Sequence, residues 1–296
     1  MKKVAFIGLG LMGISMAHNI IKAGYSVVGY DRDTSRMKLH VSNGGAFADS
    51  AAEATRGADV VITMLPVGSI VNSTLFDDGG IVETLSNDAI FIDMSTIHPT
   101  ESDAIREKLN HLGKTMIDAP VGRTSLEAVE GKLLIMAGAD ADSLRQVQPI
   151  LECMGDTVID CGGAGKGIRI KIINNFMSIT LNALSAECLT LSDKVGLNRS
   201  LAIQVMSGTA AIKSHMLTTY PAKVLRNDLT PAFAIDLANK DLLISLDLAK
   251  SLGVNMEMGL AASSIYREAQ NNGRGNQDWT ALYAMLSPEG QPVNAI

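Results

Sequence analysis

Short apolar runs alternate with helix-like stretches over the first 160 residues or so of the chain. Each run is apolar throughout, which is typical of strands that are covered on both faces, as in a parallel sheet. Helical stretches between successive strands then indicate a doubly wound α/β domain. The runs are VAFIG, SVVGYD, DVVITML, AIFIDMS, TMIDAPV, LLIMAG and TVIDCG.

The pattern changes after the pair Gly162 and Gly163. Strand-like runs end there, and patterns rich in Leu, Ala, Met and Ser continue to the end of the chain. Residues 163–196 contain no proline and are apolar on nearly every side, so we expect one long buried helix. The sequence thus predicts an α/β domain over residues 1–162 and an all-helical domain over 163–296, joined by this helix.

A glycine-rich turn of the form GxGxxG follows the first predicted strand and precedes a helix. In this context Gly8 makes the tight turn, Gly10 lets the backbone approach a pyrophosphate, and Gly13 lets helix and strand pack closely. The helix N-terminus then faces the anion, as in Rossmann domains, although a merely tight turn is the alternative. The residues assigned to the cofactor here are Gly8, Leu9, Gly10, Leu11, Met12 and Gly13.

The second predicted strand ends at Asp31. Its carboxylate can accept hydrogen bonds from the adenosine ribose hydroxyls and repel a 2′-phosphate, which favours NAD over NADP. Two alternatives remain open, because the neighbouring Arg32 could pair with such a phosphate and Asp31 could simply cap a turn.

Two further strand ends offer residues to the cofactor, because ligands of such sheets bind outside the carboxyl ends of the strands. Leu65 and Pro66 are expected to form an apolar wall. Ser95 and Thr96 offer hydroxyls to a nicotinamide or its ribose, with a helix or turn cap as the alternative.

An arginine stands in the otherwise small and nearly neutral turn DAPVGRTS, residues 118–125. Such turns favour Gly, Ser and Pro, which approach a ligand closely, so Arg123 suggests an anionic ligand. A guanidinium presents several fixed donors to a sulfonate, a carboxylate or a phosphate alike. The alternative is a pair with a protein acid such as Asp118 or Glu127.

Lys171, Asn174, Asn175 and Ser178 form one polar stripe on the long helix, at i, i+3, i+4 and i+7. Because buried polar groups cost free energy unless satisfied, the stripe is either a structural network or the wall of a site. A desolvated Lys171 suits a general acid that protonates a carbonyl oxygen as hydride reaches carbon, with Asn175 orienting either partner. Otherwise Lys171 is a surface lysine at a frayed helix start.

Composition narrows the classes of function. The 296 residues are 47% hydrophobic and carry a net charge of −6, which argues against general affinity for nucleic acid or an anionic membrane. Three cysteines without a CxxC pair suit a reducing cytoplasm, and five scattered histidines without an HExxH motif predict no metal site. Met- and Ala-rich helices in the second half indicate a homo-oligomer.

The fingerprint, the DxPV turn and the GxxxKxxNN helix together resemble the β-hydroxyacid dehydrogenase family over almost the whole chain. The resemblance implies that Lys171 is the catalytic acid/base and that Asn175 orients the substrate. It also implies that Lys240, in the later KDL segment, belongs to a part that closes over cofactor and substrate. Dimers or tetramers are expected on the same ground.

The family usually reads DxPVSGG, where a serine and glycine amides hold a substrate carboxylate, but this chain has Gly122, Arg123 and Thr124. With INNFMSITLNALSAE and VMSGTAA, this variant is similar to the members that reduce 3-sulfolactaldehyde with NADH. That similarity implies a sulfonate bound by Arg123, Asn174 and Ser178, and we also assign Gly122 and Thr124 to the substrate-binding site. The expected reaction yields 2,3-dihydroxypropane-1-sulfonate. Alternatives are a carboxylate semialdehyde substrate (succinic, tartronic or methylmalonic) and a dinucleotide-binding protein without turnover.

Overall fold

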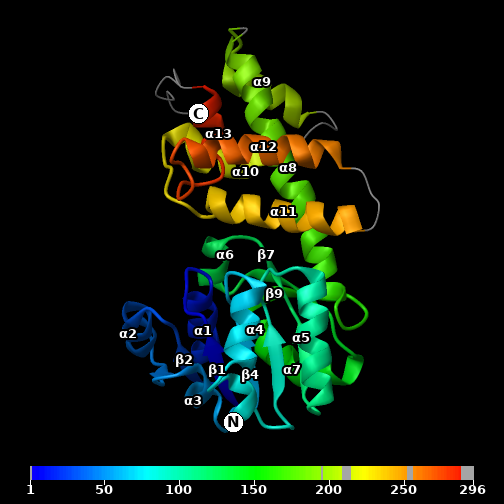
Figure 1. Ribbon diagram of the computed structural model, residues 1–296. Coiled ribbons are helices and arrows are strands. Elements are labelled where there is room, and N and C mark those ends of the chain that lie inside the picture. Colours follow the sequence, from blue (N-terminus) through cyan, green and yellow to red (C-terminus); the bar gives the residue numbers. More distant parts are fainter. Residues whose placement is uncertain (1, 195, 209–214, 252–255, 288–296) are drawn as a thin grey trace. The chain divides into compact units, whose positions relative to one another are not determined.

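The chain divides into two compact units, Met1–Lys171 and Ile172–Ile296 (Figure 1). The computed structural model describes residues 2–194, 196–208, 215–251 and 256–287. A few side chains within its helices, Cys188 among them, lie outside this description. The division falls inside helix α8 (Lys166–Lys194), so the domain boundary expected after residue 162 stays a prediction.

Six parallel strands form the main sheet of the first unit, in the order β3-β2-β1-β4-β5-β6. This is the strand order of a dinucleotide-binding Rossmann domain, and it confirms the predicted parallel sheet. The register pairs Ile7 with Thr63, Thr63 with Asp93, and Asp93 with Asp118, so the carboxyl ends meet at one edge. The strands are β1 Lys3–Ile7, β2 Ser26–Tyr30, β3 Ala46–Phe47, β4 Val60–Thr63, β5 Ile90–Asp93 and β6 Thr115–Asp118.

A second sheet of three strands, β7 (Val121–Gly122), β8 (Leu133–Ala137) and β9 (Gly155–Asp160), continues from the end of β6. Strand β7 is antiparallel to β8, and β9 is parallel to β8. The β8–β9 register is interrupted: Leu133 pairs with Gly155 and Leu134 with Thr157, which leaves Asp156 without a partner in β8.

The core of the first unit lies on both faces of the main sheet. Val4 and Phe6 of β1 belong to one buried cluster, whereas the alternate residues Ala5 and Ile7 belong to another. Because side chains alternate along a strand, this division explains why the predicted runs are apolar at every position. The helices of this unit are α1 Gly13–Lys22, α2 Thr34–Ser42, α3 Ala51–Thr55, α4 Gly68–Phe76, α5 Pro99–His111, α6 Ser125–Glu130 and α7 Ala141–Met154, with a 3₁₀ turn at Ile81–Glu83.

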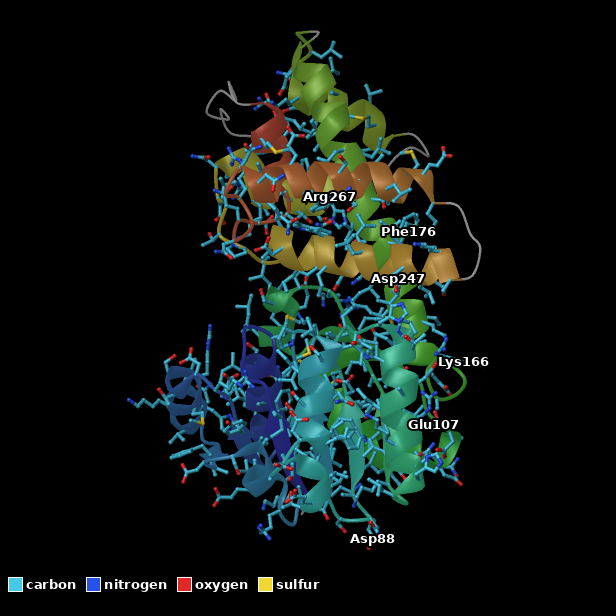
Figure 2. All side chains as sticks on the ribbon, viewed as in Figure 1. Asp88, Glu107, Lys166, Phe176, Asp247 and Arg267 are labelled. Atoms are coloured by element: carbon cyan, nitrogen blue, oxygen red, sulfur yellow. The ribbon has the colours of Figure 1, made fainter. Side chains whose placement is uncertain are left out.

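The second unit is helical in its described residues and has a core of its own. Figure 2 shows Phe176 on α8 among these helices, where its ring lies so close to Gly259 that a Cβ there would come within 2.7 Å of it. The further helices are α9 Arg199–Ser207, α10 His215–Ala222, α11 Ile235–Ser251, α12 Glu257–Asn271 and α13 Ala281–Leu286, with a 3₁₀ turn at Val224–Arg226.

The long predicted helix is confirmed as α8, but the expectation that it is buried on nearly every side is wrong. Ile173 is 66% and Met177 63% exposed in the single chain, whereas Ile172 and Ile179 are buried. Among the described residues no helix is long and apolar enough to cross a membrane. Cys153 and Cys161 are free thiols.

Candidate active site

The glycine turn between β1 and α1 tolerates no side chain at two of its three glycines. A Cβ at Gly8, whose φ is +96°, would lie 2.3 Å from the carbonyl oxygen of Met64, and one at Gly13 would lie 1.9 Å from the carbonyl oxygen of Gly8. A Cβ at Gly10, by contrast, would meet no described atom within 4 Å. Internal packing therefore does not require glycine at position 10, and the open space suits the close approach of a ligand.

The start of α1 presents unpaired backbone amides. Leu9 donates its amide proton to Asp31 Oδ2 at 2.7 Å, but no acceptor within the described part of the chain receives a hydrogen bond from the amides of residues 10–12. Met12 occupies the N-cap position and its side chain makes no capping bond. Amides left free at a helix N-terminus form an anion site, so this turn fits the pyrophosphate of a dinucleotide. Of the two leucines, Leu9 is buried and Leu11 is 51% exposed.

Asp31 lies at the carboxyl end of β2, where the ribose-binding carboxylate is expected. Its Oδ1 also accepts a hydrogen bond from the amide of Asp33 at 2.8 Å, so the carboxylate is held by backbone donors on both oxygens. Asp33 in turn is the N-cap of α2. Asp31 therefore joins the glycine turn to the start of α2.

Ser95 joins the ends of β4 and β5. Its hydroxyl oxygen accepts from the amide of Leu65 at 2.9 Å, and its side chain is buried. This is the capping alternative expected for Ser95, and the side chain of Ser95 also hydrogen-bonds the Asp93 carboxyl. Pro66, which follows Leu65, is exposed, and Thr96, which follows Ser95, is half-buried.

A buried carboxylate supports the same two strand ends. Asp93 Oδ1 accepts from the hydroxyl of Thr63 at 2.8 Å and from the amide of Ser95 at 3.1 Å. Complete burial raises the pKa of Asp93 to about 6, against the lowering effect of these hydrogen bonds.

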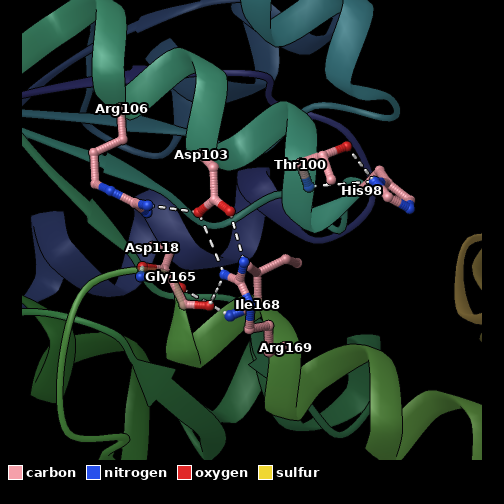
Figure 3. A network of polar contacts seen from close by, with 8 residues as sticks. All are labelled: His98, Thr100, Asp103, Arg106, Asp118, Gly165, Ile168 and Arg169. Carbon is pink, nitrogen blue, oxygen red and sulfur yellow. Dashed lines mark hydrogen bonds and ion pairs between the residues drawn. The ribbon is translucent and has the colours of Figure 1, made fainter. Parts of the chain in front are cut away.

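Asp118 caps the start of the long helix and does not pair with Arg123. Its two carboxylate oxygens accept from the amides of Gly165 at 2.5 Å and Ile168 at 2.8 Å, as Figure 3 shows. Burial raises the pKa of this carboxyl, whereas the two amide bonds lower it. The start of α8 is thus capped by a side chain from the end of β6, about 50 residues earlier in the sequence.

A second contact ties α8 to α5. Asp103 accepts from Arg169 at 2.6 Å and from Arg106 at 2.5 Å (Figure 3). Lys171 follows Arg169 by two residues and is half-buried. The two ties together therefore set the position of the helical turn that carries Lys171.

Further along α8, Asn175 belongs to a buried polar network. Its Nδ2 donates to Asp241 Oδ2 at 2.5 Å, and Asp241 forms an ion pair of 2.8 Å with Lys240. Asn175 and Asp241 are both buried. The network joins the asparagine of the KxxNN motif to the KDL segment on α11, and Asp241 had not been singled out from the sequence.

Ser178 and Asn174 occupy different environments. Asn174 is exposed, whereas Ser178 is half-buried with its Oγ 2.9 Å from Nε2 of His215. The same Nε2 lies 3.1 Å from the carbonyl oxygen of Ser178, and burial lowers the pKa of His215, which keeps the ring neutral at neutral pH. The sequence held no signal for His215 as a partner of Ser178, and residues 209–211 of the VMSGTAA segment lie outside the described residues.

Arg123 has a left-handed backbone, with φ +74°, and forms an ion pair. Its Nη1 donates to Asp156 Oδ1 at 2.7 Å and to the carbonyl oxygen of Lys132. The partner is thus an acid other than the two that the sequence had suggested. Beside it, Gly122 is buried in β7, and the Thr124 hydroxyl caps α6 and donates to Glu127 at 2.6 Å.

Family models match both halves of the chain. The NAD-binding domain of 6-phosphogluconate dehydrogenase matches residues 3–163, and the NAD-binding domain of NADP-dependent 3-hydroxyisobutyrate dehydrogenase matches residues 165–286. With the Rossmann sheet and the amide-lined glycine turn, they define an NAD-dependent oxidoreductase that acts on CH–OH groups. The prediction of NAD as cofactor is confirmed.

Similar proteins cover nearly the whole length. The chain is 47% identical over 282 residues to 3-sulfolactaldehyde reductase of Escherichia coli K12, covering 95% of each. It is 32% identical to an NAD-dependent L-serine dehydrogenase of Pseudomonas aeruginosa, covering 98% of this chain and all of the relative. A structure of Mycobacterium tuberculosis 3-hydroxyisobutyrate dehydrogenase with L-serine superposes with a TM-score of 0.89 at 32% identity, covering 97% of this chain and 99% of the other.

The chain therefore belongs to the 3-hydroxyisobutyrate dehydrogenase-like family of hydroxyacid dehydrogenases. This confirms the resemblance seen in the sequence. Its reaction interconverts a small hydroxyacid and the corresponding semialdehyde. The roles of the individual site residues stay predictions.

Proposed function

We propose that this chain reduces 3-sulfolactaldehyde to 2,3-dihydroxypropane-1-sulfonate with NADH. The observation that carries the proposal is Arg123, a guanidinium at φ +74° in the turn where the family usually has glycine. A bulky residue in the left-handed region is unfavourable and persists where it has a use. The 47% identity to a 3-sulfolactaldehyde reductase supports the same substrate.

The residues present fit the cofactor. The free amides at the start of α1 would hold the pyrophosphate and Asp31 the adenosine ribose, while the ends of β4 and β5 would lie along the nicotinamide side. When bound, NADH supplies the hydride that is added to the aldehyde carbon. Lys240, in the KDL segment, is proposed to close over the cofactor.

Lys171 completes the reduction by donating a proton from Nζ to the aldehyde oxygen, which becomes the hydroxyl of the product, and it is then reprotonated from solvent. Asn175 orients the reacting group. Because Asp241 accepts one proton of the Asn175 amide at 2.5 Å, the plane of that amide is fixed and its oxygen is directed consistently.

The anionic end of the substrate is proposed to be bound by Arg123, with Asn174 and Ser178 as neutral donors to the remaining oxygens. Gly122 and Thr124 flank this group. The Thr124 hydroxyl is already bonded to Glu127, so we expect it to shape the turn and to contribute little direct binding.

A carboxylate semialdehyde, such as succinic, tartronic or methylmalonic semialdehyde, is the second candidate. A guanidinium binds a carboxylate as readily as a sulfonate. The L-serine dehydrogenase and the 3-hydroxyisobutyrate dehydrogenase among the similar proteins carry names of carboxylate compounds. Arg123 fits either anion, and the 47% identity to a 3-sulfolactaldehyde reductase favours the sulfonate.

Replacement of Arg123 by glycine tests the proposal, because glycine relieves the positive φ and should leave the fold intact. In Arg123→Gly we expect the KM for 3-sulfolactaldehyde to rise about tenfold or more, since a charged hydrogen-bonded contact is lost. A small neutral aldehyde such as propionaldehyde should be little affected. Arg123→Lys, which keeps the charge but loses the fork, should fall between. Equal losses on both aldehydes would point to a structural arginine.

A homodimer or homotetramer is proposed as the assembly. Apolar side chains of the second unit are exposed in the single chain, among them Leu201 and Val205 on α9 and Met258 and Leu260 on α12. Faces of this kind are commonly covered by another subunit. Light scattering coupled to size-exclusion chromatography would give the mass, and a monomer at micromolar concentration would contradict the proposal.

A further inference from the structure

Asp156 is the extra residue of an irregularity at the start of β9. Its neighbours Gly155 and Thr157 pair with consecutive residues of β8, so Asp156 has no partner in that strand. An insertion of this kind changes the direction of a side chain and recurs next to functional sites. Here the Asp156 carboxylate reaches Arg123, 33 residues earlier in the chain.

The Asp156 carboxylate is itself held in place. Its Oδ1 accepts from Arg123 Nη1 at 2.7 Å and from the hydroxyl of Thr157 at 2.7 Å. The hydrogen bond from Thr157, and after it the one from Arg123, lower the pKa of Asp156, so the group is charged at neutral pH. Because Asp156 Oδ1 accepts from both donors, its position relative to Arg123 Nη1 is fixed.

The bonds of Arg123 leave one edge of its guanidinium available. Both protons of Nη1 are used, one by Asp156 and one by the carbonyl oxygen of Lys132. Nη2 lies 3.5 Å from the Thr157 hydroxyl, which is too long to restrain it, and Nε donates to no residue in the described part of the chain. The Nε–Nη2 edge carries two parallel N–H bonds, which is the geometry that binds two oxygens of one oxyanion.

We propose that Asp156 is a specificity-determining positioning residue: it grips Nη1 of Arg123 and so presents the Nε–Nη2 edge to the anionic end of the substrate. The inference rests on the proposed function, because it assumes that Arg123 meets that anion. A long arginine side chain loses conformational freedom when it binds, and prior restraint removes part of that loss from the binding step. The Asp156 grip thus favours anionic aldehydes over neutral ones.

The opposite arrangement would be a latch, in which Asp156 competes with the substrate for the guanidinium. The two arrangements predict opposite effects of removing the carboxylate. If Asp156 positions Arg123 for the substrate, removing the carboxylate leaves an arginine that binds the anion less well, and KM rises. If Asp156 competes with the substrate, removing the carboxylate leaves an arginine that binds the anion better, and KM falls.

The test compares Asp156→Ala with Asp156→Asn, because asparagine keeps an acceptor for Nη1 and alanine does not. With NADH saturating, we expect Asp156→Ala to raise the KM for 3-sulfolactaldehyde about fivefold, with kcat and the KM for propionaldehyde nearly unchanged. Asp156→Asn should stay within about twofold of the parent enzyme. Asp142→Ala, which removes another aspartate paired with an arginine in the same unit, is the matched control and should change neither KM.

An unchanged or lowered KM for 3-sulfolactaldehyde in Asp156→Ala would overturn the inference, and so would an equal rise for both aldehydes. NADH affinity and melting temperature of each variant show whether the fold is retained. The failure of this inference is distinguishable from that of the proposed function. If Arg123→Gly is selective for the anionic aldehyde while Asp156→Ala is silent, only the role of Asp156 is lost. If Arg123→Gly is unselective, the anion site itself is wrong.

Discussion

The Asp118 cap gives the sharpest test of how the structure positions the start of α8. In Asp118→Asn one carboxylate oxygen becomes an amide NH₂, while the amides of Gly165 and Ile168 still point at the two positions. Asparagine can accept from only one of them. The backbone N–H of the other residue then faces the side-chain NH₂ of the asparagine. Neither donor has an acceptor there, and water does not reach the position readily, because Asp118 is only 2% exposed.

The cost follows from these two bonds. A hydrogen bond to a charged group contributes about 1.5–3 kcal/mol, and a buried donor left without a partner costs about 1–3 kcal/mol. Loss of the buried charge offsets part of this, because the neutral asparagine amide needs less desolvation than the Asp118 carboxylate, whose pKa burial raises. We expect the free energy of unfolding to fall by about 2–3 kcal/mol, roughly a hundredfold in the equilibrium constant.

Urea unfolding at neutral pH, followed by circular dichroism, measures this difference. Asp103→Asn is the control: it removes the partly exposed pairs with Arg169 and Arg106 and should cost less than about 1 kcal/mol. In addition, kcat of Asp118→Asn should fall while NADH affinity is retained, because the helical turn that carries Lys171 loses its anchor. Stability within about 0.5 kcal/mol of the parent would refute the argument that Asp118 holds the start of α8.

Three further predictions concern the cofactor domain and Lys171, the proposed general acid. Lys171→Ala should lower kcat by about a hundredfold or more with NADH affinity nearly intact, as stopped-flow binding and steady-state rates would show; loss of NADH binding with turnover retained would remove the lysine from catalysis. Asp31→Ala should weaken NADH binding more than NADPH binding, measured by fluorescence titration, and an unchanged ratio of the two affinities would exclude Asp31 from the ribose site. Asp93 has a pKa of about 6 in the folded protein against 3.8 for an ordinary aspartate, so the folded state binds the carboxyl proton more tightly than the unfolded state does. This difference stabilises the fold at low pH, and the stabilisation is lost as pH rises from about 4 to about 6. The loss amounts to about 3 kcal/mol, and urea midpoints of Asp93→Asn should lack that part of the pH dependence, whereas superimposable pH profiles for the two proteins would contradict the buried charge.

The sequence predicts the main sheet well because every long strand is apolar throughout, and burial on both faces is the cause of that pattern. Strands β3 and β7, of two residues each, were not predicted, since two residues carry no periodicity. The long helix was predicted to begin near residue 163, but it begins at Lys166, after a turn whose amides reach back to Asp118. A cap that comes from a distant strand has no local signal.

Only part of the site could be predicted from the sequence. Local spacing identified the glycine turn and the polar stripe of α8, because each depends on residues within a few positions of one another. The partners of these residues come from far along the chain: Asp241 for Asn175, His215 for Ser178, and Asp156 for Arg123. Asp156 in particular reaches Arg123 through an irregular strand register, which no periodic pattern encodes.

The choice of substrate is the central claim, and its most direct test is NADH oxidation by the purified protein, followed by loss of NADH absorbance. We would compare kcat/KM for 3-sulfolactaldehyde with the values for succinic, tartronic and methylmalonic semialdehydes. A preference for 3-sulfolactaldehyde of about a hundredfold, roughly 2.7 kcal/mol of transition-state discrimination, is the expected result. A higher kcat/KM for any of the carboxylate semialdehydes would contradict the sulfonate assignment and leave Arg123 as a general anchor for anions.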